Sequence, residues 1–361
     1  MPHDARGAFL FCPVEERNTR GKDFAGHSRH NLKIRVPILF IRSAALVVAS
    51  CVVPSLVQLR ADQSAGSAQA EASFRTVQDE TGRSVRIPIP VRRVVSLAPS
   101  MTESLYALGM DNLLVGDTDY CDYPPAAMKK HKVGGATNPS LEEIAALRPD
   151  VVLVTKSLNR LETVQQLERL GIAAYATDPH SVDEIRSSVH RLAEILGNPA
   201  AGEALDIEMT RQENSLRQRL QNIAPKRVLF VVWTDPLISV GKHTFIADAL
   251  THAGAISVVD SPQDWPQMSL EEMVRLQPEF LVFASGHSDA ISRDVDALAK
   301  RPGWEELEAV KHRKFAVISD AVNRPAPRLL SAVEELARQL HPEAFSETSA
   351  ARTASVPTGK N

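Results

Sequence analysis

Histidine is the side chain that most often performs acid–base chemistry or binds a metal, so histidine spacing is a first test for an enzyme. Only His287, which follows the run Ala284-Ser285-Gly286, stands after an apolar segment where a strand end is expected. No G-x-S-x-G nucleophile elbow occurs. The sequence therefore lends no support to catalysis, which stays open at this point. The histidines that follow residue 70 show no H-x-H or H-E-x-x-H spacing, and they are His131, His180, His190, His243, His252, His287, His312 and His341.

Two acids, Glu142 and Glu271, occupy equivalent positions in a segment that occurs twice. In each copy a Ser-x-x-Glu pattern, beginning at Ser140 and at Ser269, predicts a capping box and hence a helix N-terminus. The glutamate that closes each pattern has that structural task, whereas Glu142 and Glu271 have none beyond a favourable place near the positive end of a helix dipole. They are either solvated acids in a first helical turn or a paired electrostatic surface that contacts a partner.

Aromatic side chains stand in three loops or strand ends. Tyr120 and Tyr123 lie in a loop that two prolines follow, and Trp265 lies in a polar loop flanked by Pro262 and Pro266. Loops on a rigid scaffold are common ligand contacts, and these rings offer an apolar face together with a hydrogen-bonding group. The tyrosines either meet a ligand or pack beneath their loop, and Trp265 is favoured as a ligand wall. Trp233 ends an apolar run beside Asp235-Pro236.

The elements that position these residues are also duplicated. Segment 140–150 returns as segment 269–279, and each ends at a proline that precedes four apolar residues, 151–154 and 280–283. Apolar positions three residues apart predict one buried stripe on each short helix. The apolar runs predict strands that are buried on both faces, as in parallel sheets. A helix that feeds a buried strand, present twice at domain-sized spacing, predicts two similar α/β lobes.

The remaining pattern predicts how the lobes are joined. Segment 74–90 alternates like an edge hairpin, and segment 93–97 predicts a buried strand before a helix that a capping box from Ser100 to Glu103 would open. Asn198-Pro199 begins a long amphipathic segment, which predicts one stiff helix between the lobes. The predicted organisation is an export signal and linker over 1–70, a first lobe over 71–197, a bridging helix over 198–224, a second lobe over 225–341 and a disordered tail over 342–361.

The composition is that of a globular protein. The chain has 361 residues, of which 43% are hydrophobic and 24% charged, and its formal net charge of −3 gives no reason to expect a nucleic-acid partner. Its cysteines, Cys12, Cys51 and Cys121, form no C-x-x-C pair. Neither a zinc site nor a disulfide framework is therefore predicted.

The N-terminal segment predicts export. The apolar stretch 43–53 has the length of a signal h-region and is too short for a bilayer span of roughly 20 residues. Val48-Ala49-Ser50-Cys51 is similar to the lipobox of bacterial lipoproteins, which makes Cys51 a possible lipidation site. Ala68-Gln69-Ala70 is instead a site for ordinary signal peptidase. A soluble periplasmic product and a membrane-anchored lipoprotein both remain open.

Several segments together resemble a known family. They lie between about residues 92 and 340, in the order in which the family carries them. The chain is similar through them to the periplasmic cobalamin and ferric-siderophore binding proteins of ABC importers. The segments are 93–103, 119–125, 138–142, 148–150 and the turn Trp265-Pro266-Gln267.

The resemblance implies two Rossmann-like lobes bridged by one helix, a small-molecule ligand in the cleft between them and little closure on binding. It implies no resident cofactor. One glutamate per lobe, Glu142 and Glu271, would dock onto arginines of the permease. The cobalamin branch is the better match, because Tyr120 and Trp265 fall where that branch places aromatic rings.

Two positions depart from the cobalamin pattern, since Ala136 and Ala321 stand where aromatic residues are expected. Trp233, from across the cleft, would compensate for them as a ligand contact. A ferric siderophore, or haem, is the alternative ligand, and a siderophore would use basic groups such as Arg324 and Arg328. A metal-dependent enzyme or metallochaperone on the same scaffold, with a role for His287, is the alternative class. A sensor without a permease is a third possibility. Bound metal in the purified protein would favour the metal-dependent enzyme or metallochaperone.

Overall fold

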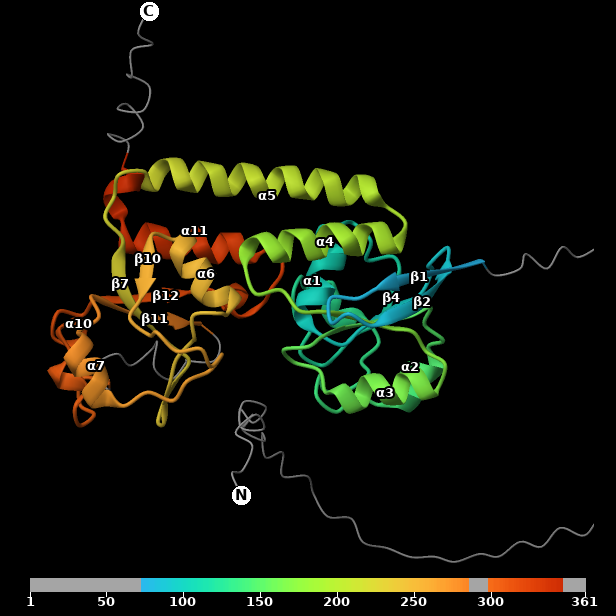
Figure 1. Ribbon diagram of the computed structural model, residues 1–361, viewed down its shortest axis with the longest axis horizontal. Coiled ribbons are helices and arrows are strands. Elements are labelled where there is room, and N and C mark those ends of the chain that lie inside the picture. The colour runs from blue at the N-terminus through green and yellow to red at the C-terminus, as the bar shows by residue number, and fades with distance from the viewer. Residues whose placement is uncertain (1–72, 286–297, 347–361) are drawn as a thin grey trace, which may run out of the picture. The chain divides into compact units, whose positions relative to one another are not determined.

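The computed structural model describes residues 73–285 and 298–346 (Figure 1). The described part opens with an antiparallel hairpin, β1 (Ser73–Gln78) and β2 (Ser84–Ile89). Gly82 takes a φ of +82° in the turn, a conformation that favours glycine. The predicted edge hairpin is therefore confirmed.

A parallel four-stranded sheet forms the core of the N-terminal lobe, with strand order β4-β3-β5-β6. Val151 and Leu153 of β5 belong to a hydrophobic cluster with α1 and α4, whereas Val152 and Val154 belong to one with α2 and α3. Because both faces are covered, β5 needs an unbroken apolar run. The strands are β3 (Val94–Ser96), β4 (Leu114–Gly116), β5 (Val151–Thr155) and β6 (Ala174–Thr177), and the helices are α1 (Pro99–Ala107), α2 (Leu141–Ala146), α3 (Leu161–Arg169) and α4 (Val182–Leu196).

The C-terminal lobe repeats this architecture. Its parallel sheet has the order β10-β7-β11-β12, so the second, first, third and fourth strands lie side by side as in the first lobe. Val282 of β11 packs with α6 and α11, and Leu281 and Phe283 pack with α7 and α10. The strands are β7 (Lys226–Val231), β10 (Ala255–Ser257), β11 (Phe280–Ala284) and β12 (Phe315–Ile318), and the helices are α6 (Phe245–His252), α7 (Leu270–Leu276), α10 (Glu308–Lys311) and α11 (Leu329–Leu340).

Helix α5 (Pro199–Leu220) connects the lobes and runs alongside α4 (Figure 1). The Asn198 side chain caps it by accepting from the Ala201 N–H group. Leu205 packs against the cores of both lobes. The first turns of α4 also reach the second core, through Val182 and Ile185. The predicted bridging helix is present, and α4 reinforces it.

Short elements complete the described chain, and the strands β4, β9 (Leu237–Ile238) and β10 were not predicted. β4 and β10 are three residues long and lie at sheet edges. The 3-10 helix η5 (Pro342–Phe345) lies where the disordered tail was expected to begin, and Phe345 packs against the second core. The other short elements are the hairpin β8 (Trp233–Thr234) and β9 (Leu237–Ile238) and the 3-10 helices η2 (Ala127–Lys129), η3 (Trp304–Glu306) and η4 (Asp320–Asn323).

Within the described residues, no helix combines the length and the apolar composition that crossing a membrane requires. The same residues contain no group of three or more His, Cys, Asp or Glu side chains that could hold a metal ion. Cys51 and His287 lie outside the described residues.

Candidate functional site

Glu142 and Glu271 are both exposed in the first turns of α2 and α7. The Ser140 hydroxyl accepts from the Glu143 N–H group at 3.2 Å, and Ser269 caps α7 in the same way. Within 73–285 and 298–346, no hydrogen bond or ion pair engages the carboxylate of Glu142 or of Glu271. Both acids therefore present a charge to the surroundings at equivalent places on the two lobes.

One of the two hydrogen bonds of the predicted capping box is absent in α2, namely the one from the Ser140 N–H group to the Glu143 carboxylate. The Glu143 carboxylate lies 2.8 Å from His131 Nε2 instead of reaching back to Ser140. The Ser140 N–H group donates to the Val133 carbonyl, so it has no need of a carboxylate. Glu143 thus joins helix α2 to the loop that carries His131.

The predicted capping box from Ser100 to Glu103 is also wrong. α1 begins at Pro99, its N-cap residue is Ala98, and no side chain caps it. Proline has no N–H group to satisfy at the first helical position, which lowers the need for a cap. The Glu103 side chain, only 2% exposed, instead points to residues of the C-terminal lobe.

Glu103 is the centre of an ion network between the lobes. Arg324 Nη1 donates to Glu103 Oε1 at 2.7 Å, and Arg328 donates to both Glu103 oxygens at 2.9 Å through Nε and Nη2. Arg324 also pairs with Asp122 at 2.7 Å and with Asp320 at 2.8 Å. Arg328 pairs with Asp320 at 3.3 Å. We call Glu103, Asp122, Asp320, Arg324 and Arg328 the inter-lobe network.

The network favours the charged forms of Asp122 and Arg324. Burial would raise the pKa of the Asp122 carboxyl, but the hydrogen bond and the charge of Arg324 hold it below its usual value. Burial would lower the pKa of Arg324, and its bonds to Asp122 and Glu103 raise it instead. Arg324, predicted from the sequence as a ligand contact, is thus occupied by three carboxylates.

Buried contacts anchor the loop that carries Tyr120 and Tyr123. Cys121 is buried between them, and its sulfur lies 3.1 Å from Thr102 Oγ1 and 3.2 Å from Thr118 Oγ1. Lys132 pairs with the buried Asp117 and donates to the Cys121 carbonyl. The loop is therefore anchored at its centre.

Both tyrosines of that loop are exposed. Tyr120 is 53% exposed and Tyr123 is 44% exposed, which excludes the alternative that they pack beneath the loop. The Arg328 guanidinium lies 4.1 Å from the centroid of the Tyr123 ring, a cation–π contact. Tyr123 is thereby tied to the inter-lobe network, and Tyr120 is available as an aromatic surface.

The two predicted tryptophans come from neighbouring segments of the C-terminal lobe. Trp233 of β8 is 37% exposed and donates from Nε1 to the Asp235 carbonyl at 2.8 Å. Trp265 is partly buried against the second core. The segment around it pairs with the chain after β9, since Ser239 N–H donates to the Pro266 carbonyl. Trp265 therefore has a packing role in addition to any ligand contact.

Gly241 sets how closely that segment approaches. Its N–H group donates to the Asp264 carbonyl, and a Cβ atom there would lie 1.8 Å from the Gln263 carbonyl oxygen. Any larger residue would push the Trp265 segment outward. The place of Trp265 thus depends on a glycine that the sequence reading did not single out.

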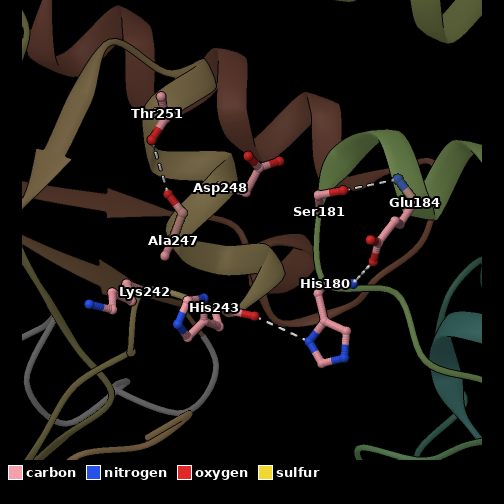
Figure 2. Close-up of a pocket in the computed structure, with 8 residues that line it drawn as sticks. All are labelled: His180, Ser181, Glu184, Lys242, His243, Ala247, Asp248 and Thr251. Carbon is pink, nitrogen blue, oxygen red and sulfur yellow. Dashed lines mark hydrogen bonds between the residues drawn. The ribbon is translucent and has the colours of Figure 1, made fainter. Parts of the chain in front are cut away.

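A pocket of about 530 Å³ lies between the N-terminal turns of α4 and of α6 (Figure 2). His180 Nδ1 lies 3.1 Å from the His243 carbonyl oxygen, and Asp248 accepts from the Val182 N–H group at 2.8 Å. The pocket shares no residue with the predicted ligand site. Its lining side chains are His180, Ser181, Glu184, Lys242, His243, Ala247, Asp248 and Thr251.

A second polar cluster lies beside this pocket. Asp248 and Glu213, from α6 and α5, flank His252 at 3.5 and 3.6 Å. The hydrogen bond to Asp248 raises the pKa of His252, although burial opposes the rise. Arg186 of α4 also pairs with Glu213, at 3.3 Å. The cluster therefore joins helices α4, α5 and α6.

Comparison with known proteins gives a matching family and several relatives. The family model described as "Periplasmic binding protein" matches residues 94–322. An uncharacterized ABC transporter substrate-binding lipoprotein, YvrC of Bacillus subtilis, is 32% identical over 314 residues, which is 84% of this chain and 96% of that protein. The vitamin B12-binding protein of Yersinia pestis is 31% identical over 249 residues, which is 69% of this chain and 86% of that protein.

Solved structures give the same fold. The periplasmic vitamin B12 binding protein BtuF of Vibrio cholerae aligns with a TM-score of 0.62 at 28% identity, over 72% of this chain and 99% of that one. The periplasmic heme-binding protein RhuT from Roseiflexus sp. RS-1 aligns with a TM-score of 0.63 at 26% identity, over 70% of this chain and 99% of that one. The two-lobed α/β fold is therefore shared with a vitamin B12 binding protein and a heme-binding protein.

Proposed function

The chain belongs to the periplasmic binding protein family that serves ABC importers, a family of binding proteins rather than enzymes, and we propose that its ligand is a corrinoid held between the two lobes. The permease and the small ligand follow from the family, whereas the identity of the ligand is our proposal. We assign the ligand contacts to Tyr120, Tyr123, Trp233 and Trp265.

The exposed ring of Tyr120 carries the proposal. An anchored loop with two outward-facing tyrosines offers a firm aromatic surface on one lobe. The other lobe adds Trp233, which is partly exposed on the β8–β9 hairpin. A corrinoid is large and flat, and its broad apolar faces suit such rings. Relatives described as vitamin B12-binding proteins support the same ligand class.

The charges favour a corrinoid over an anionic siderophore. A ferric catecholate or carboxylate chelate needs unpaired basic groups, but Arg324 and Arg328 are both bonded to carboxylates. Binding such a chelate through them would require breaking pairs with the buried Glu103, which is costly. Haem is the second candidate, because a tyrosine phenolate can ligate ferric haem and Tyr120 is exposed.

A fluorescence titration of the purified protein tests the ligand. We expect cyanocobalamin to quench tryptophan emission with saturable 1:1 binding, and ferric enterobactin to cause no saturable change. Haemin is the third arm: binding with a charge-transfer band that disappears in Tyr120→Phe would favour haem. Failure of all three ligands to bind would refute the ligand assignment.

We propose that Glu142 and Glu271 dock the protein onto basic residues of the permease. Both carboxylates are exposed, and neither has a partner among residues 73–285 and 298–346. The double change Glu142→Ala with Glu271→Ala is expected to abolish uptake in cells and leave the ligand affinity unchanged. The matched control is Glu143→Gln with Glu272→Gln, which alters the neighbouring acids of the same helical turns and should retain uptake. Equal loss in both double variants would refute specific docking.

We further propose that the protein is exported, and that it carries a lipid on Cys51 or is cleaved after Ala70. The curated relative YvrC is described as a lipoprotein, which supports the first route. Mass spectrometry of the mature protein from a native membrane fraction distinguishes them. A diacylated N-terminal cysteine that is lost in Cys51→Ser supports lipidation, whereas an unmodified N-terminus at Glu71 in the soluble fraction supports cleavage.

A further inference from the structure

The inter-lobe network does not balance its own charges. It contains three carboxylates, Glu103, Asp122 and Asp320, and two guanidinium groups, those of Arg324 and Arg328. The hydrogen bonds hold the arginines charged and Asp122 ionised. One negative charge is therefore left uncompensated within the network.

The exposed fractions of the three carboxylates indicate which of them carry the uncompensated charge. The Glu103 side chain is 2% exposed and takes bonds from both arginines, so its charge is matched inside the protein. Asp122 and Asp320 are 58% and 32% exposed. The uncompensated charge therefore lies at the outer side of the network, on these two residues.

The aromatic surface lies directly beside it. Asp122 stands between Tyr120 and Tyr123 in sequence, and Tyr123 stacks on the guanidinium of Arg328, which is also paired with Asp320. A ligand on the tyrosines consequently meets the negative side of the network. Charges in contact with a partly desolvated ligand interact more strongly than charges in bulk water.

We propose that Asp122 and Asp320 set the charge selectivity of the binding site: they admit neutral or cationic corrinoids and reject ligands that carry additional carboxylates. This inference rests on the proposed function, since it concerns the same site. It also assigns to Asp122, which sequence reading passed over, a role in specificity. Arg324 then acts as a positioning residue, which holds both carboxylates in place.

The test uses two forms of one ligand that differ by a single charge. Cyanocobalamin is compared with its b-, d- and e-monocarboxylic acids, in each of which one propionamide is hydrolysed to a carboxylate. At low salt we expect the wild-type protein to bind at least one acid about tenfold more weakly than the amide, and the ratio to shrink as salt rises.

Asp122→Asn and Asp320→Asn should each bring that ratio close to one. Glu208→Gln is the matched control, because Glu208 is an exposed carboxylate that also pairs with an arginine but lies on α5 outside the network. The control should keep the wild-type ratio. Wild-type protein that does not distinguish amide from acid, or variants whose ratio equals the control's, would overturn the charge selectivity alone. Absence of cyanocobalamin binding by the wild type would instead refute the proposed function and the inference with it.

Discussion

The N-terminal and C-terminal lobes share a strand order but contribute different side chains to the surface between them. The first lobe presents an anchored loop with two exposed tyrosines and the buried acid Glu103. The second presents two arginines and a tryptophan on a short hairpin. The fold is thus duplicated and the site is not. Glu142 and Glu271, the proposed docking acids, are among the side chains that keep equivalent places in the two copies.

Single changes of the docking acids test how far that equivalence extends. Glu142→Ala and Glu271→Ala should each lower ligand uptake by about tenfold or more, because each removes one charge from a contact with a cationic partner. Uptake of labelled ligand by whole cells is the measurement, with ligand affinity of the purified variants as the control. A loss confined to one of the two variants would break the equivalence of the lobes.

Glu103→Ala tests the surface at which the lobes differ. Removing it leaves Arg328 with Asp320 as its remaining ion-pair partner among the described residues. We expect the free energy of unfolding to fall by about 3 kcal/mol, the cost typical of breaking a buried ion pair. Urea denaturation followed by circular dichroism measures it. Asp122→Asn, at the exposed edge, should cost less than about 1 kcal/mol. Equal effects would contradict the buried and exposed sides assigned to the network.

Tyr120 and Trp265 sharpen the comparison between the aromatic contributions. Tyr120→Ala should weaken ligand binding by about tenfold with little change in thermal stability, because its ring is exposed. Trp265→Ala should lower both, with the unfolding free energy reduced by about 2 kcal/mol through lost packing against the second core. Calorimetric titration and thermal melts of the two variants give both quantities. An unchanged melting temperature in Trp265→Ala would show that its burial adds nothing to stability.

The smallest expected effect concerns how His252 makes the free energy of unfolding depend on pH. The pKa of His252 is raised in the folded protein, mainly by its hydrogen bond to Asp248. Its contribution is therefore complete below the unfolded pKa of about 6.5 and is lost as the pH rises through the folded value. Between pH 5.5 and 8.5 the free energy of unfolding should fall further in the wild type than in His252→Gln. The difference between the two falls should be below about 1 kcal/mol. Urea midpoints at the two pH values measure the difference. A larger fall in the variant would contradict this sign.

Sequence reading predicted the parts of the fold that local pattern controls. β5 and β11 were found because strands covered on both faces need unbroken apolar runs. β4 and β10 were missed because they are short edge strands, and Ile256 of β10 is 53% exposed. The caps at Ser140 and Ser269 were found because the cap and its N–H donor lie three residues apart.

The site was harder to predict because its contacts join distant residues. Glu103 fits a capping pattern with Ser100, but its partners, Arg324 and Arg328, lie 221 and 225 residues later in the chain. No local spacing reports such a pair. For the same reason the sequence did not indicate that the Arg324 guanidinium is engaged by three carboxylates. A contact of Arg324 with a ligand stays a prediction. The aromatic ligand contacts remain predictions.

Isothermal titration of the purified protein with cyanocobalamin tests the central claim most directly. If the two lobes hold a corrinoid between an anchored tyrosine loop and a tryptophan hairpin, the titration will show one ligand per chain. Saturable binding will also weaken in Tyr120→Ala. Absence of binding heat at any accessible concentration, confirmed by failure of the ligand to co-elute with the protein, would contradict the account.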